Sequence, residues 1–107
     1  MTTETKIGQL QMMEHTLQNL LAQKQQVQSQ LLEAESASTE LKTTDAAYKI
    51  VGNVMIKKSK TALLKEAKDK TERLGIRMKS IEKQESQIKE KVKGLQDEVM
   101  ADMKKND

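Results

Sequence analysis

Between residues 10 and 41, apolar side chains recur at steps of three and four positions. Eight of the ten stepped positions are apolar, against five of the 22 positions between them. This spacing puts one side chain per turn on the same face of a helix and is typical of the a and d positions of a coiled-coil heptad. The stepped positions, which we call the seam, are Leu10, Met13, Leu17, Leu20, Lys24, Val27, Leu31, Ala34, Ser38 and Leu41.

A second run with the same spacing covers residues 64–102, and nine of its twelve positions are apolar. A strict period of seven predicts a left-handed supercoil. We therefore expect one helix over residues 6–43 and another over residues 60–104. Gly75 and Gly94 lie off the seam and each weakens the second helix by about 1 kcal/mol. The seam positions of this run are Leu64, Ala67, Thr71, Leu74, Met78, Ile81, Glu85, Ile88, Val92, Leu95, Val99 and Asp102.

The segment between the two runs has a different pattern. Thr43-Thr44-Asp45 predicts the end of the first helix, and two stretches rich in β-branched residues then flank the pair Gly52-Asn53. Two such stretches around a two-residue turn predict a β-hairpin, here over residues 47–58. Glycine at the first central position accepts a positive φ, which a type II′ turn requires.

The expected register gives this hairpin two apolar faces. An isolated two-stranded hairpin is marginally stable in water, and its open edges invite further pairing. We interpret the hairpin as an element that joins hairpins of other chains in a shared sheet or barrel. The alternative is that it folds back onto its own helices. The pairs are Val51 with Val54 and Lys49 with Ile56 on one face, and Ile50 with Met55 and Tyr48 with Lys57 on the other.

A short connection makes neighbouring helices antiparallel. If the hairpin is the bend, Leu41 lies opposite Leu64, and the numbers of facing residues add up to about 105. The same rule brings Lys24 and Glu85 within one turn of each other. We predict that they form a polar layer, which fixes the register at some cost in stability. Alternatively, each side chain reaches the solvent separately.

The composition supports long helices rather than a compact globule. The chain of 107 residues has room for one domain, contains no Phe or Trp, and has Tyr48 as its only aromatic residue. Aromatic side chains carry much of the buried area of compact cores. The absence of Pro and a net charge of only +3 argue against disorder. The expected fold is mainly α, a long antiparallel two-helix coiled coil joined by a β-hairpin, and forms a single domain over residues 1–107.

The charge is unevenly distributed, with a net of −3 over residues 1–41 and +6 over residues 42–107. A basic segment raises nucleic acid as a partner. The bases alternate with acids, however, and pairs such as Glu66 with Lys70 are one helical turn apart. This pattern favours a solvated helix face over a nucleic-acid-binding module, and so does the lack of aromatic residues.

Neither a membrane span nor a signal peptide is predicted. No stretch approaches the roughly 18 apolar residues that a spanning helix needs, and residues 1–6 lack the apolar core of a signal peptide. Cysteine is absent, which fits a reducing compartment. We expect a cytoplasmic protein.

The sequence offers no set of residues for catalysis. His15 is the only histidine, falls on the outer face of the first helix, and has no cysteine or HExxH context that would suggest a metal site. Two paired helices enclose no concave pocket for a catalytic set. The four glycines are too scattered for a phosphate-binding loop. We expect neither an enzyme nor a bound cofactor.

Methionine is distributed unusually, since five of the seven methionines map to the end of the coiled coil that lies away from the hairpin. Flexible, polarizable methionine surfaces suit contact with many apolar partners. The alternative is that scattered apolar residues at a fraying coiled-coil end have no role of their own. Ile7 and Val99 join this group, whose methionines are Met1, Met12, Met13, Met100 and Met103.

The order helix, hairpin, helix at this length resembles the prefoldin family, specifically a β-type, archaeal-like subunit. The most specific similarity is Tyr48-Lys49-Ile50-Val51-Gly52 followed by Val54-Met55-Ile56-Lys57. Two helical segments add to it: Gln23-Lys24-Gln25-Gln26-Val27 and Ile81-Glu82-Lys83-Gln84-Glu85.

The resemblance implies a heterohexamer of two α-type and four β-type subunits, in which the hairpins build a double β-barrel. Such assemblies hold non-native polypeptides at the ends of the coiled coils without ATP and pass them to a group II chaperonin. The alternative is a structural coiled-coil adaptor that binds one folded partner. The resemblance assigns assembly to Tyr48, Ile50, Val51, Gly52, Val54, Met55 and Ile56, and client binding to Ile7, Leu10, Met12, Met13, Val99, Met100 and Met103.

Overall fold

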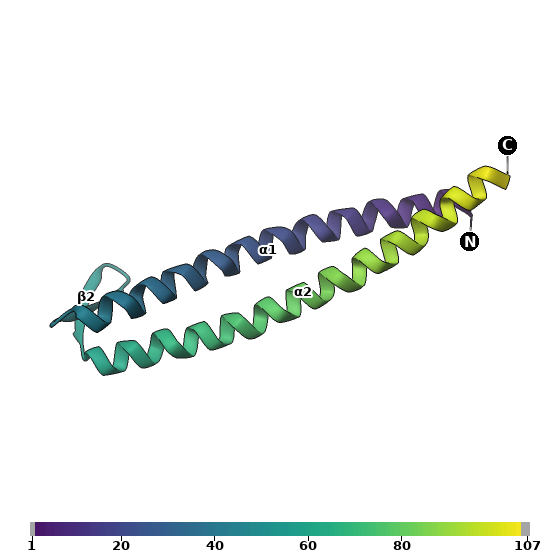
Figure 1. Cartoon of the computed structure of the whole chain (residues 1–107). Helices are drawn as coiled ribbons and strands as arrows, with labels where there is room; N and C mark the ends of the chain where they lie inside the picture. Colours follow the sequence, from purple (N-terminus) through teal and green to yellow (C-terminus); the bar gives the residue numbers. More distant parts are fainter. Residues whose placement is uncertain (1, 106–107) are drawn as a thin grey trace. The chain divides into compact units, whose positions relative to one another are not determined.

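The structure is a computed structural model, and it describes residues 2–105 of the chain. Helix α1 covers Thr3–Thr43, strands β1 and β2 cover Ala47–Val51 and Val54–Lys58, and helix α2 covers Lys60–Lys105. The expected fold class is confirmed: two long helices are joined by an antiparallel two-stranded hairpin (Figure 1). α1 begins three residues before the expected start.

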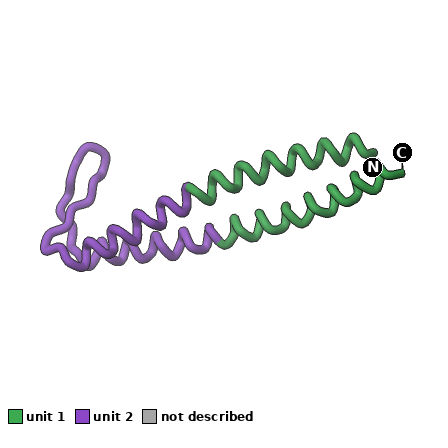
Figure 2. Tube along the Cα trace, turned by 45° about the horizontal axis from the view of Figure 1, so that its top comes forward, with its two compact units in different colours: residues 1–25, 79–107 green, residues 26–78 purple. Residues whose placement is uncertain are grey.

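The chain divides into two compact units, unit 1 with residues 1–25 and 79–107 and unit 2 with residues 26–78 (Figure 2). Unit 1 contains the first part of α1 and the last part of α2. Unit 2 contains the rest of both helices and the hairpin. Within each unit α1 and α2 lie side by side and run in opposite directions.

The helix starts and ends at residues whose side chains satisfy free backbone groups. The Thr2 hydroxyl accepts a hydrogen bond of 3.1 Å from the Thr5 amide, and the Ser59 hydroxyl accepts one of 3.1 Å from the Ala62 amide. Both are N-caps, a role that Ser and Thr favour. At the end of α1, the Thr44 hydroxyl donates to the Glu40 carbonyl oxygen at 2.8 Å. α1 ends at Thr43, within the segment Thr43-Thr44-Asp45 that predicted the helix end.

Burial follows the predicted seam. Every seam position is buried or half-buried, and six of the seven buried residues among those described belong to it. Each helix therefore buries a narrow stripe, as the heptad pattern predicts. The buried seam residues are Leu20, Ile81 and Val99 in unit 1, and Val27, Ala34 and Leu74 in unit 2.

The hairpin has the predicted register, with Val51 paired to Val54 and Ile50 to Met55. Gly52 has a φ of 60°, and no other described residue has a positive φ. A positive φ at the first central position and a negative one at Asn53 is the pattern of a type II′ turn. A Cβ at Gly52 would meet nothing within 4 Å, so the backbone conformation alone makes glycine the favoured residue.

Candidate functional site

The two strands expose apolar side chains on both faces of the hairpin. Alternate residues of a strand point to opposite faces, and all six large apolar side chains here are between 44% and 71% exposed. No part of the described chain buries either set. We call these residues the hairpin surface: Tyr48, Ile50, Val51, Val54, Met55 and Ile56.

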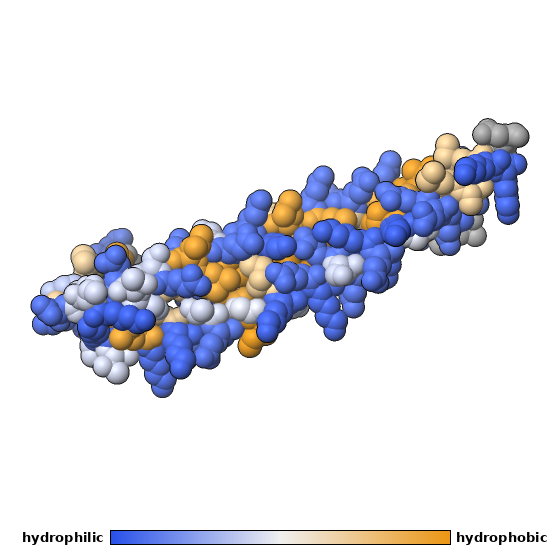
Figure 3. Space-filling view, viewed as in Figure 1, coloured by the Kyte–Doolittle hydropathy of each residue, from blue (hydrophilic) through white to orange (hydrophobic). Residues whose placement is uncertain are grey.

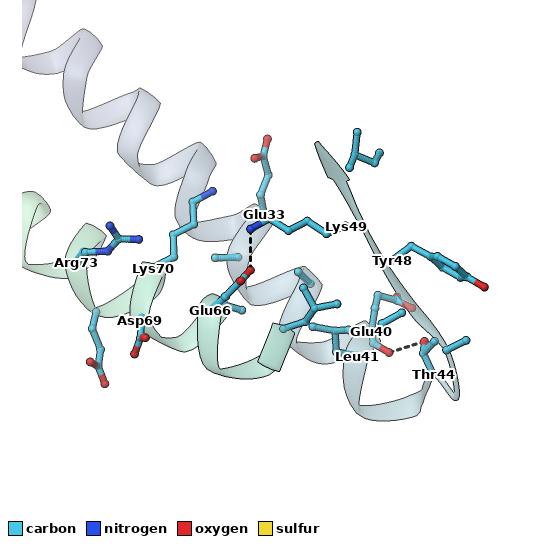
Figure 4. A pocket seen from close by; sticks show the side chains of 18 of the residues that line it. Glu33, Glu40, Leu41, Thr44, Tyr48, Lys49, Glu66, Asp69, Lys70 and Arg73 are labelled. Atoms are coloured by element: carbon cyan, nitrogen blue, oxygen red, sulfur yellow. Dashed lines mark hydrogen bonds and ion pairs between the residues drawn. The ribbon is translucent and has the colours of Figure 1, made fainter. Parts of the chain in front are cut away.

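Two ion pairs connect the hairpin to α2. Lys49 in β1 and Lys58 in β2 place their Nζ atoms 3.1 and 3.2 Å from the two carboxylate oxygens of Glu66. The hydrogen bonds from Lys49 and Lys58 hold the pKa of the Glu66 carboxyl below its usual value. In Figure 4 the Lys49 side chain points toward Glu66, whereas the Tyr48 ring points to the opposite side.

An open groove of about 1260 Å³ lies between the hairpin and the two helices of unit 2. Its lining combines small apolar side chains, including Ala34, Ala37 and Ala67, with acidic and basic residues. Glu66 and Lys49 belong to this lining, so the ion pair crosses the groove (Figure 4).

The helix ends in unit 1 carry a second apolar surface. Ile7, Met12, Met100 and Met103 are between 41% and 73% exposed, and we call these four residues the end surface. Figure 3 shows hydrophobic patches between hydrophilic side chains along the helices. The other residues assigned to client binding lie in the seam: Leu10 and Met13 are half-buried, and Val99 is buried. Met1 lies outside the described residues.

A polar cluster, which we call the end clasp, joins the two helix ends. Lys6 Nζ lies 2.9 Å from Asp102 Oδ2, and the Thr3 hydroxyl donates to the same oxygen at 3.1 Å. Glu98 lies 3.8 Å from Lys6 Nζ. The hydrogen bond between Lys6 and Asp102 raises the pKa of Lys6 and, as the largest cause, lowers the pKa of Asp102.

A further ion pair lies within the seam of unit 1. Lys24 Nζ is 3.2 Å from Glu85 Oε1, and the two side chains are 26% and 13% exposed. The predicted contact between these residues is therefore confirmed. Its role in fixing the register stays a prediction.

The heptad and strand patterns did not predict the end clasp or the ion pairs at Glu66. A signal for the clasp was present, since Lys6 is one seam step before Leu10 and Asp102 is itself a seam position. The ion pairs at Glu66 leave no periodic signal, because they join strands to a helix.

The described residues contain no cluster of three or more His, Cys, Asp and Glu residues that could hold a metal ion. None of the described helices is long and apolar enough to cross a membrane. His15 is exposed on α1.

Two long antiparallel helices joined by an exposed apolar β-hairpin define a class of coiled-coil proteins. The family model described as prefoldin subunit matches residues 4–106. The chain belongs to the prefoldin subunit family, a family of non-enzymatic chaperones. The resemblance read from the hairpin motif is thereby confirmed.

Relatives and a solved structure agree with this assignment. The chain is 40% identical over 101 residues to prefoldin subunit beta of Pyrococcus furiosus, covering 92% of this chain and 86% of that protein. It is 39% identical over 103 residues to prefoldin subunit beta of Methanospirillum hungatei, with coverages of 94% and 86%. The crystal structure of the prefoldin beta subunit from Thermococcus strain KS-1 matches with a TM-score of 0.86, 33% identity, and coverage of 92% of this chain and 90% of that chain.

Proposed function

We propose that this chain is the β-type subunit of a cytoplasmic heterohexamer with two α-type and four β-type subunits. The assembly captures non-native polypeptides at the helix ends without ATP and passes them to a group II chaperonin. The observation that carries the proposal is the hairpin surface, which is apolar on both faces and uncovered in the described chain. The relatives' name, subunit beta, supports a partner subunit of another type.

The assembly part of the proposal rests on the physics of a small sheet. Two strands have two open edges, and their free N–H and C=O groups pair readily with another strand. Burying apolar surface gains roughly 25 cal/mol per Å². Hairpins from several subunits therefore stabilise one another when they close into a common barrel, which also removes the open edges.

The capture part of the proposal rests on the end surface. Methionine side chains adapt to differently shaped apolar partners. Each contact with an exposed apolar segment of a client is worth roughly 1–2 kcal/mol by area burial, which is weak alone. Several subunits in one assembly combine such contacts into useful avidity. Leu10, Met13 and Val99 lie in the seam near this surface and would contact a client only where the two helices separate locally.

Solution mass tests the assembly part. The chain is measured by native mass spectrometry alone and mixed with an α-type prefoldin subunit. We expect a hexamer with two α-type and four β-type subunits in the mixture only. A stable monomer or simple dimer in both samples would contradict the proposal and favour a coiled-coil adaptor with a single folded partner.

Suppression of client aggregation tests the capture part. The variant Met12→Ser/Met100→Ser/Met103→Ser removes most of the end surface and leaves the hairpin unchanged. We expect normal assembly and at least a fivefold loss of protection for a chemically unfolded client. Leu32→Ser is the matched control, because Leu32 is 66% exposed on α1 but lies in unit 2. Equal protection by the triple variant and wild type would contradict capture at the helix ends.

A further inference from the structure

Two lysines from different strands converge on a single helical carboxylate in unit 2. Lys49 of β1 and Lys58 of β2 each donate a hydrogen bond to Glu66 of α2, at 3.1 and 3.2 Å. Each lysine takes a different carboxylate oxygen, so both contacts exist at the same time. One residue of α2 thereby holds both strands.

Little else fixes the direction of the hairpin relative to α2. Ala47 is the only strand residue that is buried. Among the described residues, the side-chain hydrogen bonds between strands and helices both end on Glu66. The pairing of β1 with β2 fixes the hairpin internally, and Glu66 adds side-chain contacts across the short connection at Ser59 between β2 and α2.

The contact with Glu66 makes the two hairpin faces unequal. Lys49 pairs with Ile56 and Lys58 with Ala47, so both lysines share one face. Tyr48, Ile50 and Met55 lie on the other face, and Figure 4 shows Tyr48 directed away from Glu66. The ion pairs thus engage one face, and the apolar side chains of the other face are 54–71% exposed.

We propose that Glu66 is a positioning residue for assembly: it holds the hairpin by its lysine face, so that the face with Tyr48, Ile50 and Met55 meets the hairpins of other subunits. This inference rests on the proposed function, because it specifies how the hairpin is presented for assembly. In this proposal Glu66 positions the hairpin without being part of the surface that meets other subunits. It acts through Lys49 and Lys58.

A weak tether is sufficient for this role. Exposed ion pairs contribute little to the stability of a chain. If only a fraction of the chains hold the hairpin in the direction that binds, however, the apparent affinity falls in proportion to that fraction. If the fraction of chains with a correctly directed hairpin falls about threefold, the equilibrium constant of an assembly that needs four such chains falls about 80-fold. The substitution therefore affects assembly far more than folding.

The direction of the hairpin is measured first, in the full chain alone. The chain has no cysteine, so nitroxide labels on Asn53→Cys/Lys65→Cys report the distance between the turn and α2. We expect a narrow distance distribution in the labelled chain that becomes at least twofold broader when Glu66→Gln is added. The distribution should also broaden in 1 M salt, because the Debye length falls to about 3 Å and the ion pairs are screened. Unchanged widths would overturn the proposal.

Assembly with an α-type subunit is measured next. We expect Glu66→Gln to lower the equilibrium constant of hexamer formation at least tenfold, with the helix content of the chain unchanged. Asp69→Asn is the matched control and is expected within twofold of wild type. Asp69 is also exposed on α2 and lines the same groove, but it makes no salt bridge within the described part of the chain.

Charge reversal separates positioning from a merely structural effect. Lys49→Glu/Lys58→Glu sets three carboxylates together and is expected to abolish assembly. Adding Glu66→Lys restores the ion pairs with opposite signs and is expected to restore assembly to within about threefold of wild type. A triple variant that assembles no better than the double variant would overturn the role of Glu66.

A variant of the presented face separates this proposal from the proposed function. Ile50→Ser removes apolar surface without touching the ion pairs. If Ile50→Ser abolishes assembly while Glu66→Gln has no effect, the positioning role is wrong and assembly through the hairpin stands. If wild type forms no hexamer, or if both variants assemble normally, both proposals are overturned.

Discussion

Lys24 and Glu85 form an ion pair of 3.2 Å between α1 and α2, at two positions where the heptad pattern calls for apolar residues. Neighbouring seam residues such as Leu20 and Ile81 are buried. The charged pair therefore interrupts an apolar stripe. A sliding of one helix against the other would place each charge against apolar side chains.

Replacing both charges with Lys24→Leu/Glu85→Leu should raise the melting temperature and loosen the register, because apolar pairs often stabilise more than charged ones but discriminate less. Labels on Gln18→Cys/Lys89→Cys, both exposed in unit 1, report the register as a distance distribution. We expect one narrow peak in wild type and two or more in the leucine variant. The swap Lys24→Glu/Glu85→Lys is the control and should keep one peak. A single peak in the leucine variant would show that the pair has no specifying role.

The periodicity of the sequence was sufficient to predict the seam, the hairpin register and the turn type. These features depend on local rules: the heptad step, the alternation along a strand, and the φ that Gly52 accepts. The ion pairs of Glu66 were not predictable, because they depend on the angle between a hairpin and a helix, which no residue spacing specifies.

Exposure also divides the residues that sequence analysis grouped at the helix ends. Met12 and Met100 fall off the seam and are exposed, whereas Val99 falls on the seam and is buried. Their positions in the heptad already contained this distinction. Grouping the residues by type and by location along the chain did not separate seam positions from off-seam positions.

The end clasp should respond to pH at both extremes. The pKa of Asp102 is lowered from 3.8, chiefly by the hydrogen bond from Lys6, so its contribution is present above pH 3.8 and is lost as the pH falls further. The pKa of Lys6 is raised from 10.5, chiefly by the hydrogen bond to Asp102, so its contribution is present below pH 10.5 and is lost as the pH rises further. The clasp is thus complete between these two values.

An NMR titration of the Asp102 carboxyl group checks the clasp. In Lys6→Met we expect the pKa of Asp102 to rise toward its usual value, and the amides of the first turn of α1 to exchange faster at pH 7. Lys104→Met is the control, since it removes a neighbouring charge but leaves the clasp. A pKa of Asp102 that is the same in Lys6→Met and wild type would mean that the contact does not persist in solution.

Substitutions on α1 should lower the free energy of unfolding far more at seam positions than at off-seam positions. Val27 is 2% exposed, and Val27→Ala removes two methyl groups that are worth about 0.8 kcal/mol each. The better helix propensity of alanine offsets part of this loss, so we expect destabilisation by about 1–2 kcal/mol in urea unfolding followed by circular dichroism. Leu32→Ala, at a 66% exposed position of the same helix, should change stability by less than about 0.5 kcal/mol. Equal effects would contradict the assigned seam.

Glycine-to-alanine substitutions should have opposite effects at different places in the chain. Gly75 and Gly94 lie inside α2, where an added Cβ meets nothing within 4 Å, so each substitution should stabilise the helix by about 1 kcal/mol. Gly52 also has free space around it, but its φ of 60° penalises a Cβ by about 1–2 kcal/mol. The melting temperature should therefore rise for Gly75→Ala and Gly94→Ala. For Gly52→Ala, hydrogen exchange of the amides in β1 and β2 should become faster. Because free space is the same at all three sites, a stabilised hairpin in Gly52→Ala would rule out the left-handed backbone at the turn.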